Sequence, residues 1–229
     1  MKNMSRGPVF RTLLSFALPL FLGNVFQQLY SLVDAWAVGN FSDSPQTALA
    51  AVGASFPILF LIIAVIMGLT QGAAIMISQY FGAEDRERLR RGVSTLLIFL
   101  SAASVVMTLF GLMAAEPILR LLRTPDEVLG PATAYLRILS AGMVFMVAYN
   151  GFAAILRGVG DSKTPLYFLI LASLLNVALD LVFVMALRMG TEGVAWATVI
   201  SQGISAVLCL VYMRRRIPLL RFSLAEMIF

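Results

Sequence analysis

Residues 165–187 read PLYFLILASLLNVALDLVFVMAL, and Asp180 is the one charged residue in this run. About 20 predominantly apolar residues are enough to cross the hydrocarbon core of a bilayer as a helix. The run therefore predicts a membrane-spanning helix that carries a carboxyl group. A charge at membrane depth costs at least about 2.5 kcal/mol on insertion scales, so Asp180 needs a structural or functional reason to be there.

The composition extends this interpretation to the whole chain. Of its 229 residues, 60% are hydrophobic and 13% are charged, about half the charged share of roughly 25% found in soluble domains. We therefore expect an all-α polytopic membrane protein whose main partner is the lipid bilayer. The net charge of +5 reflects membrane topology, and no nucleic-acid partner is predicted.

The same composition argues against an enzyme. The sequence contains no His, which is the commonest general base and metal ligand. Its single cysteine, Cys209, lies in an apolar run, so an intrachain disulfide and a zinc or redox motif are excluded. We expect no cofactor.

Six segments are long and apolar enough to be membrane spans. Their apolar runs are continuous and lack the alternation of a membrane β-barrel, so helices are predicted. The connections between them are short and polar. The predicted spans are roughly 12–38, 53–80, 93–115, 133–156, 165–187 and 193–213.

The basic residues predict the orientation of these spans. Of the 17 Lys and Arg residues, 13 fall on one side of the membrane, and only Arg120, Arg123, Arg137 and Arg188 fall on the other. Cytoplasmic loops carry the excess of basic residues. Both termini are therefore predicted to be cytoplasmic, which agrees with an even number of spans. The expected location is a cell membrane, specifically the bacterial inner membrane.

Two acidic residues, Asp34 and Asp180, fall inside spans. Asn176 precedes Asp180 by one helical turn, so both side chains leave the same face. In the predicted orientation, these three residues and Thr198 lie at similar depth on three helices. Their oxygens suit a hard cation, or the carboxyl groups can take up protons. A buried structural pair is the alternative.

The first span also carries a line of polar side chains, spaced 3, 4 and 3 residues apart and therefore on one helix face. They are Asn24, Gln27, Ser31 and Asp34, with Gln28 beside them. Interhelical hydrogen bonds, worth about 0.6–2 kcal/mol each, explain one or two such residues. Four in line, ending at an acid, favour the wall of a solvated cavity. Pro19 in the same span predicts a kink and a candidate hinge.

Several stretches resemble one transporter family. They include FALPLFLGNVFQQLYSLVDAWAVG, GLTQGAAIMISQYFGAED, ILRGVGDSKTP, NVALD and GVAWATVISQ. In this order they are similar to the amino-terminal half of a multidrug and toxic compound extrusion (MATE) transporter. The resemblance implies a secondary antiporter that exports organic cations or drugs in exchange for H⁺ or Na⁺ by alternating access. It also implies a cation site at Asp34, Asn176, Asp180 and Thr198, and bending of the first helix at Pro19.

The chain departs from that family in length, because family members contain two six-helix lobes. Residues 1–229 correspond to one lobe, and the second is absent from this sequence. The chain is then a fragment, a truncated product, or a half-transporter that pairs with a second copy. Two other functions stay open. One is a lipid-linked oligosaccharide flippase of the same superfamily, and the other is a membrane component that does not transport.

Overall fold

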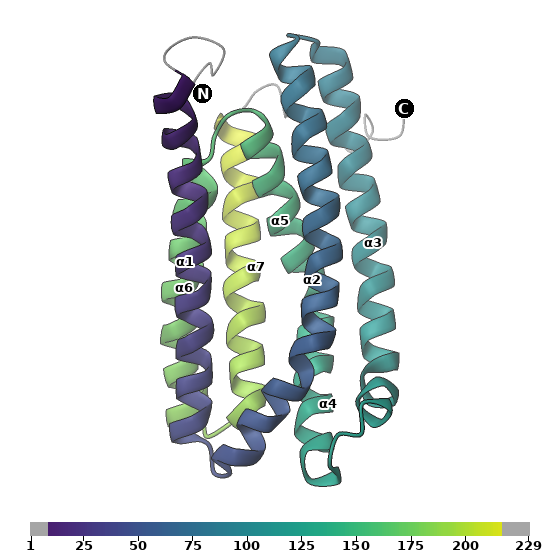
Figure 1. The fold of residues 1–229 in the computed structure, drawn as a ribbon, viewed down its shortest axis with the longest axis vertical. Coiled ribbons are helices and arrows are strands. Elements are labelled where there is room, and N and C mark those ends of the chain that lie inside the picture. The colour runs from purple at the N-terminus through teal and green to yellow at the C-terminus, as the bar shows by residue number, and fades with distance from the viewer. Residues whose placement is uncertain (1–8, 217–229) are drawn as a thin grey trace.

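The computed structural model describes residues 9–216, which are helical over nearly their whole length and contain no strand (Figure 1). The sixth helix continues directly into a short π-helical segment, labelled η1. The elements are α1 (Val9–Phe41), α2 (Pro45–Gly82), α3 (Arg86–Leu121), α4 (Asp126–Ala141), α5 (Met143–Gly158), α6 (Lys163–Asp180), η1 (Leu181–Ala186) and α7 (Gly190–Arg216).

Five of the described helices are long and apolar enough to cross a membrane, and the number is six if the bent pair of α4 and α5 counts as one span. The predicted all-α polytopic fold is therefore confirmed. Some helices are longer than the predicted spans. Helix α2 has 38 residues and begins at Pro45, not near residue 53. At 1.5 Å per residue it is about 57 Å long, compared with about 30 Å of hydrocarbon.

The fourth predicted span, 133–156, is not one straight helix. Helices α4 and α5 meet at Gly142 with a bend of 48°. A Cβ atom at Gly142 would lie 2.3 Å from Cγ2 of Val199 in α7, far inside van der Waals contact. The missing side chain therefore lets α7 pass close to the bend. A glycine in an apolar run gives no indication of this contact in the sequence.

Helix α7 lies in the middle of the bundle, with α1 and α6 side by side on one flank and α2 and α3 on the other (Figure 1). Helix α1 begins and α7 ends at the same end of the bundle, which we call the basic end. The starts of α3 and α6 and the end of α5 also lie there. The basic residues on these helix ends are Arg86, Arg88, Arg90, Arg91, Arg157, Lys163, Arg214, Arg215 and Arg216.

The arrangement thus sorts most basic residues of the described chain as the sequence predicted. The exception is Arg137, which lies inside α4, where its Nη2 is 3.7 Å from Oε2 of Glu116 in α3. Arg120, Arg123 and Arg188 lie at the opposite end, at the α3–α4 turn and before α7. Lys2, Arg6 and Arg221, which also entered the orientation argument, lie outside the described residues. That the basic end faces the cytoplasm stays a prediction, supported by the positive-inside rule.

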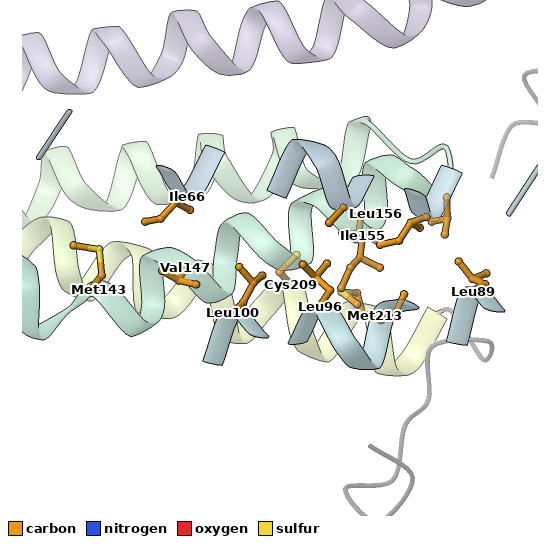
Figure 2. Close-up of a cluster of buried hydrophobic side chains, with 14 residues drawn as sticks. Ile66, Leu89, Leu96, Leu100, Met143, Val147, Ile155, Leu156, Cys209 and Met213 are labelled. Carbon is orange, nitrogen blue, oxygen red and sulfur yellow. The ribbon is translucent and has the colours of Figure 1, made fainter. Parts of the chain in front are cut away.

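The largest apolar core occupies the basic half of the bundle and joins α2, α3, α5 and α7 (Figure 2). Ile155 and Leu156 of α5 are fully buried there, and Cys209 of α7 is a buried free thiol. Many other large apolar side chains are exposed, as on α3, where Met113 is 76% exposed and Val106 65%. A protein in water rarely exposes so much apolar surface, so the bilayer is the expected solvent for these faces.

Candidate cation site

The two intramembrane acids meet because α1 and α6 run in the same direction. A Cβ atom at Gly23 of α1 would lie 3.3 Å from Cδ2 of Leu169 in α6, so the helices touch there. Asp34 follows Gly23 by 11 residues, and Asp180 follows Leu169 by 11. Eleven residues make about three turns, which returns to nearly the same face. Both carboxyl groups therefore arrive at the α1–α6 contact.

The acids lie deep enough to lose most of their hydration. Asp180 is fully buried, and Asp34 is partly buried. The carboxyl groups are close enough to share a hydrogen bond when one of them holds a proton. When both are ionised they repel each other in a medium of low dielectric constant. A proton or a metal cation between them removes that repulsion.

The predicted amide and hydroxyl also join this site. Asn176 is 2% exposed, and its Nδ2 donates to Oγ1 of Thr198 over 3.4 Å. This long hydrogen bond connects α6 to α7 one helical turn from Asp180, on the side toward the basic end. The structure therefore brings Asp34, Asn176, Asp180 and Thr198 together from three helices.

Several buried acceptor oxygens of the site have no hydrogen-bond partner. Eight buried side-chain polar atoms of the described residues lack a hydrogen-bond partner, and five of them are carboxylate or amide oxygens. Buried polar atoms normally have partners, so an unpartnered group of this size needs an explanation. The five atoms are Oδ1 of Asp34, Oδ1 of Asn176, both carboxylate oxygens of Asp180 and Oε1 of Gln202.

An apolar cluster covers the acids on the side away from the basic end. Val38 and Val184 each follow one of the acids by four residues, and Val194 precedes Thr198 by four. All three are at most 1% exposed and pack together with Tyr135 of α4 and Ala48 of α2. This packing separates the acid pair from the opposite end of the bundle.

The backbone changes geometry directly after Asp180. From Leu181 to Ala186 the chain winds as a π-helix, in which each N–H bonds five residues back. The N–H of Leu187 donates to the carbonyl of Val182 over 3.0 Å. The π-helical segment ends α6, and residues 187–189 after it are not helical. No residue type in 181–186 signals the wider turn in advance.

The polar line predicted along α1 divides into two sets. Gln27 and Asp34 are partly buried toward the lobe, whereas Asn24, Gln28 and Ser31 are exposed. The Ser31 hydroxyl donates to the backbone carbonyl of Gln27 over 3.1 Å, a bond within its own helix. Exposed polar groups on one flank are compatible with a solvated wall. A role in lining a cavity stays a prediction.

Pro19 lies inside α1 and is buried. Figure 1 shows α1 as one unbroken helix through this position. A proline in a helix interior removes one backbone donor and weakens the helix locally. The predicted hinge at Pro19 therefore stays a hypothesis about movement.

Three polar residues near the site escaped the sequence interpretation. Tyr30 lies one helical turn from Asp34 on α1, and Tyr135 packs with Val38 and Val184, each one turn from an acid. Tyr30 precedes Asp34 by four residues and Gln202 follows Thr198 by four, so helical spacing would have placed them on the site faces. Tyr135 comes from α4, and only the tertiary fold reveals its position.

A comparison with known families agrees with this geometry. The MatE family model matches residues 19–182, which include α1 from Pro19 and the acid of α6. The chain belongs to the MatE family. This family consists of transporters, as the sequence interpretation expected, and not of enzymes.

Individual relatives agree. The chain is 39% identical over 226 residues to the probable multidrug resistance protein YoeA of Bacillus subtilis, covering 97% of this chain and 48% of that protein. It also resembles a multidrug resistance MATE family transporter solved in an outward-facing conformation, with a TM-score of 0.90 and 29% identity. That match covers 99% of this chain and 50% of the transporter.

A third match is a MOP superfamily transporter from Pyrococcus furiosus, with a TM-score of 0.89 and 30% identity. It covers 97% of this chain and 49% of that one. The chain thus spans about half the length of the relatives it matches. It corresponds to one lobe of such a MatE transporter.

Proposed function

We propose that this MatE chain forms the cation-coupling lobe of a secondary transporter, in which Asp34, Asn176, Asp180 and Thr198 bind H⁺ or Na⁺. The observation that carries the proposal is the set of four buried acceptor oxygens without donors on Asp34, Asn176 and Asp180. A cation supplies the positive charge or the proton that these oxygens lack. Carboxylate, amide and hydroxyl oxygens are suitable ligands for Na⁺, and the carboxyl pair is suitable for a proton.

The transported substrate in this proposal is an organic cation or drug that leaves the cell in exchange for the coupling ion. The names of the relatives support this substrate class. Alternating access requires that cation binding and substrate binding favour different conformations, since a ligand shifts an equilibrium only by its differential affinity. Bending of α1 near Pro19 is the proposed conformational change, because that helix carries Asp34 and packs on α6.

A single lobe leaves one wall of a substrate path open. We propose that a second six-helix lobe, or a second copy of this chain, supplies the other wall. The relatives are about twice as long as this chain, which supports a second lobe. The proposed location is the inner membrane of a bacterial cell, with the basic end in the cytoplasm.

Efflux measurements in everted membrane vesicles test the proposed function. The natural polypeptide that contains this sequence is expressed, and transport of a fluorescent organic cation is driven by an imposed H⁺ or Na⁺ gradient. Asp180→Asn and Asp34→Asn should each abolish gradient-driven transport while the protein stays in the membrane. Transport at the wild-type rate in either variant would contradict the coupling role.

A matched control separates the site from acidity in general. Asp161 is partly buried at the basic end and accepts hydrogen bonds from the backbone N–H and the hydroxyl of Thr164. The Asp161 carboxylate already has hydrogen-bond donors and lies away from the site. Transport by Asp161→Asn should therefore still depend on the imposed gradient. Loss of coupling in this control would show that any buried acid produces the effect.

A further inference from the structure

The π-helical segment η1 lies between the candidate site and α7, and its role is not explained by membrane spanning. An ordinary α-helix would cross the bilayer with better hydrogen bonds. The wider turn begins at the residue after Asp180, so it determines how the chain leaves the acid. It therefore acts on the position of one of the two carboxyl groups.

Two contacts hold this segment in place. The first is Val184, which is fully buried among Val38, Val194 and Tyr135. It is the only residue of η1 that is buried, so it is the main side-chain anchor of an otherwise exposed turn. The π-helical segment is thus fixed to α1, α4 and α7 through one side chain.

The second contact is at Gly193 in the first turn of α7. A Cβ atom there would lie 3.0 Å from Cβ and 3.3 Å from the backbone carbonyl carbon of Phe183, and 3.1 Å from Cβ of Met189. These distances are tighter than ordinary contacts, and one of the atoms is backbone. The segment rests directly on the glycine, and a side chain at this position would displace it.

We propose that η1, supported by Gly193, positions the Asp180 carboxyl group against Asp34, so that Gly193 is a positioning residue of the cation site. This inference rests on the proposed cation site. A methyl group at Gly193 forces η1 away from α7 by a few tenths of an ångström. The displacement reaches Asp180 through the adjoining turn, whereas Asp34 on α1 stays in place.

Alanine is otherwise the better helix residue, by roughly 0.5–1 kcal/mol relative to glycine. A Gly→Ala change in α7 is therefore expected to raise helix stability where space allows. Gly203 of the same helix offers this comparison, because its Cβ would lie 3.5 Å from the Phe145 ring, an ordinary contact. Gly193→Ala and Gly203→Ala are therefore a matched pair of variants. Only the first places its new methyl group against η1.

Infrared difference spectroscopy of the natural polypeptide in detergent tests the proposal. The carboxyl band that Asp180→Asn removes is titrated with H⁺ and with Na⁺. In Gly193→Ala we expect the H⁺ or Na⁺ concentration at half saturation to change by about three- to tenfold, since displacements well below 1 Å weaken a fitted site. Gly203→Ala should titrate like the wild type. Gly193→Val should enlarge the change.

Two results would separate failure of this inference from failure of the proposed function. If no carboxyl band is lost in Asp180→Asn, the cation site itself is wrong. If the band is present but Gly193→Ala and Gly193→Val titrate like Gly203→Ala, the site holds and the positioning role is wrong. Thermal unfolding of each variant provides the second readout. If Gly193→Ala lowers the melting temperature but leaves the H⁺ and Na⁺ titrations unchanged, Gly193 has only a packing role.

Discussion

The two halves of the bundle differ in whether their buried polar groups have hydrogen-bond partners. In the basic half, the Tyr149 hydroxyl donates to the carbonyl of Pro165 over 2.9 Å, and the Ser205 hydroxyl donates to the carbonyl of Phe168 over 3.0 Å. The apolar core of Figure 2 lies in the same half. In the other half, Asp34, Asp180 and Asn176 keep buried oxygens without donors.

The backbone follows the same division. Close packing in the basic half uses regular helices, as at Gly158, where a Cβ atom would lie 2.6 Å from Cγ2 of Ile77. The other half contains the π-helical segment, and the bend at Gly142 lies between the two halves. The polar groups named in the basic half are paired, whereas the other half contains buried oxygens without donors where a ligand is expected. Stability and function should therefore respond differently to substitution in the two halves.

The largest loss of stability is expected in the core. Leu156 is fully buried in the basic half, and Leu156→Ala should lower the free energy of unfolding by an amount near the lower end of about 2–5 kcal/mol. The lower end applies because lipid is as apolar as leucine, so burying the carbons that Leu156→Ala removes gains less free energy than it would in a protein that unfolds into water. Thermal unfolding in detergent measures the loss. Leu109→Ala, at a side chain that is 55% exposed on α3, should change stability little, and an equal loss there would contradict the account.

The second prediction has the opposite sign. Asp180→Asn removes a charge and places an amide donor beside Asp34, so it should raise the free energy of unfolding by about 1–3 kcal/mol at neutral or higher pH without Na⁺. Asp161→Asn makes the same chemical change where the carboxylate already accepts two hydrogen bonds, and it should lower stability. If Asp180→Asn and Asp161→Asn shift the melting temperature in the same direction relative to the wild type, the two halves do not differ in this respect.

A smaller difference is expected between two interhelical hydrogen bonds. Ser205→Ala removes a bond of 3.0 Å and Thr198→Val removes one of 3.4 Å. Bonds of this kind in membranes average about 0.6 kcal/mol, so Ser205→Ala should cost about that much. The longer Thr198 bond should cost less. Chemical denaturation of both variants gives the comparison, and a larger loss for Thr198→Val would show that the site is held together more tightly than its geometry indicates.

The smallest effect is expected at the exposed ion pair of Arg188 and Asp43, whose charged atoms are 3.7 Å apart at the end opposite the basic one. Both side chains are about three-quarters exposed. Arg188→Gln should therefore change the free energy of unfolding by less than about 0.5 kcal/mol. A loss above 1 kcal/mol in thermal unfolding would mean that this loop contact supports the apolar cluster below it.

The sequence predicted the spans and the acid pair because both depend on local patterns. Long apolar runs determine the helices, and an acid such as Asp180 is conspicuous in one of them. Depth counted along three helices was enough to group Asn176 and Thr198 with the acids, and the hydrogen bond between their side chains agrees with that grouping.

The remaining features depend on contacts between helices. Helix α7 passes close to the bend at Gly142 because that residue has no side chain to meet Val199, and η1 lies against Gly193 in the same way. A glycine looks the same in a sequence whether a neighbour touches it or not. Tyr135 illustrates the same limit, because α4 reaches the site only through the packing of the cluster that contains Val184.

The most direct test of the account is cation binding by the acid pair itself. Equilibrium binding of ²²Na⁺, together with H⁺ uptake in unbuffered solution, is measured for the natural polypeptide and for the Asp34→Asn/Asp180→Asn variant. We expect saturable binding of Na⁺ or H⁺ to the natural polypeptide that the double variant lacks, while the double variant stays folded with an equal or higher melting temperature. Equal binding by both proteins would contradict the claim that these two carboxyl groups hold the coupling cation.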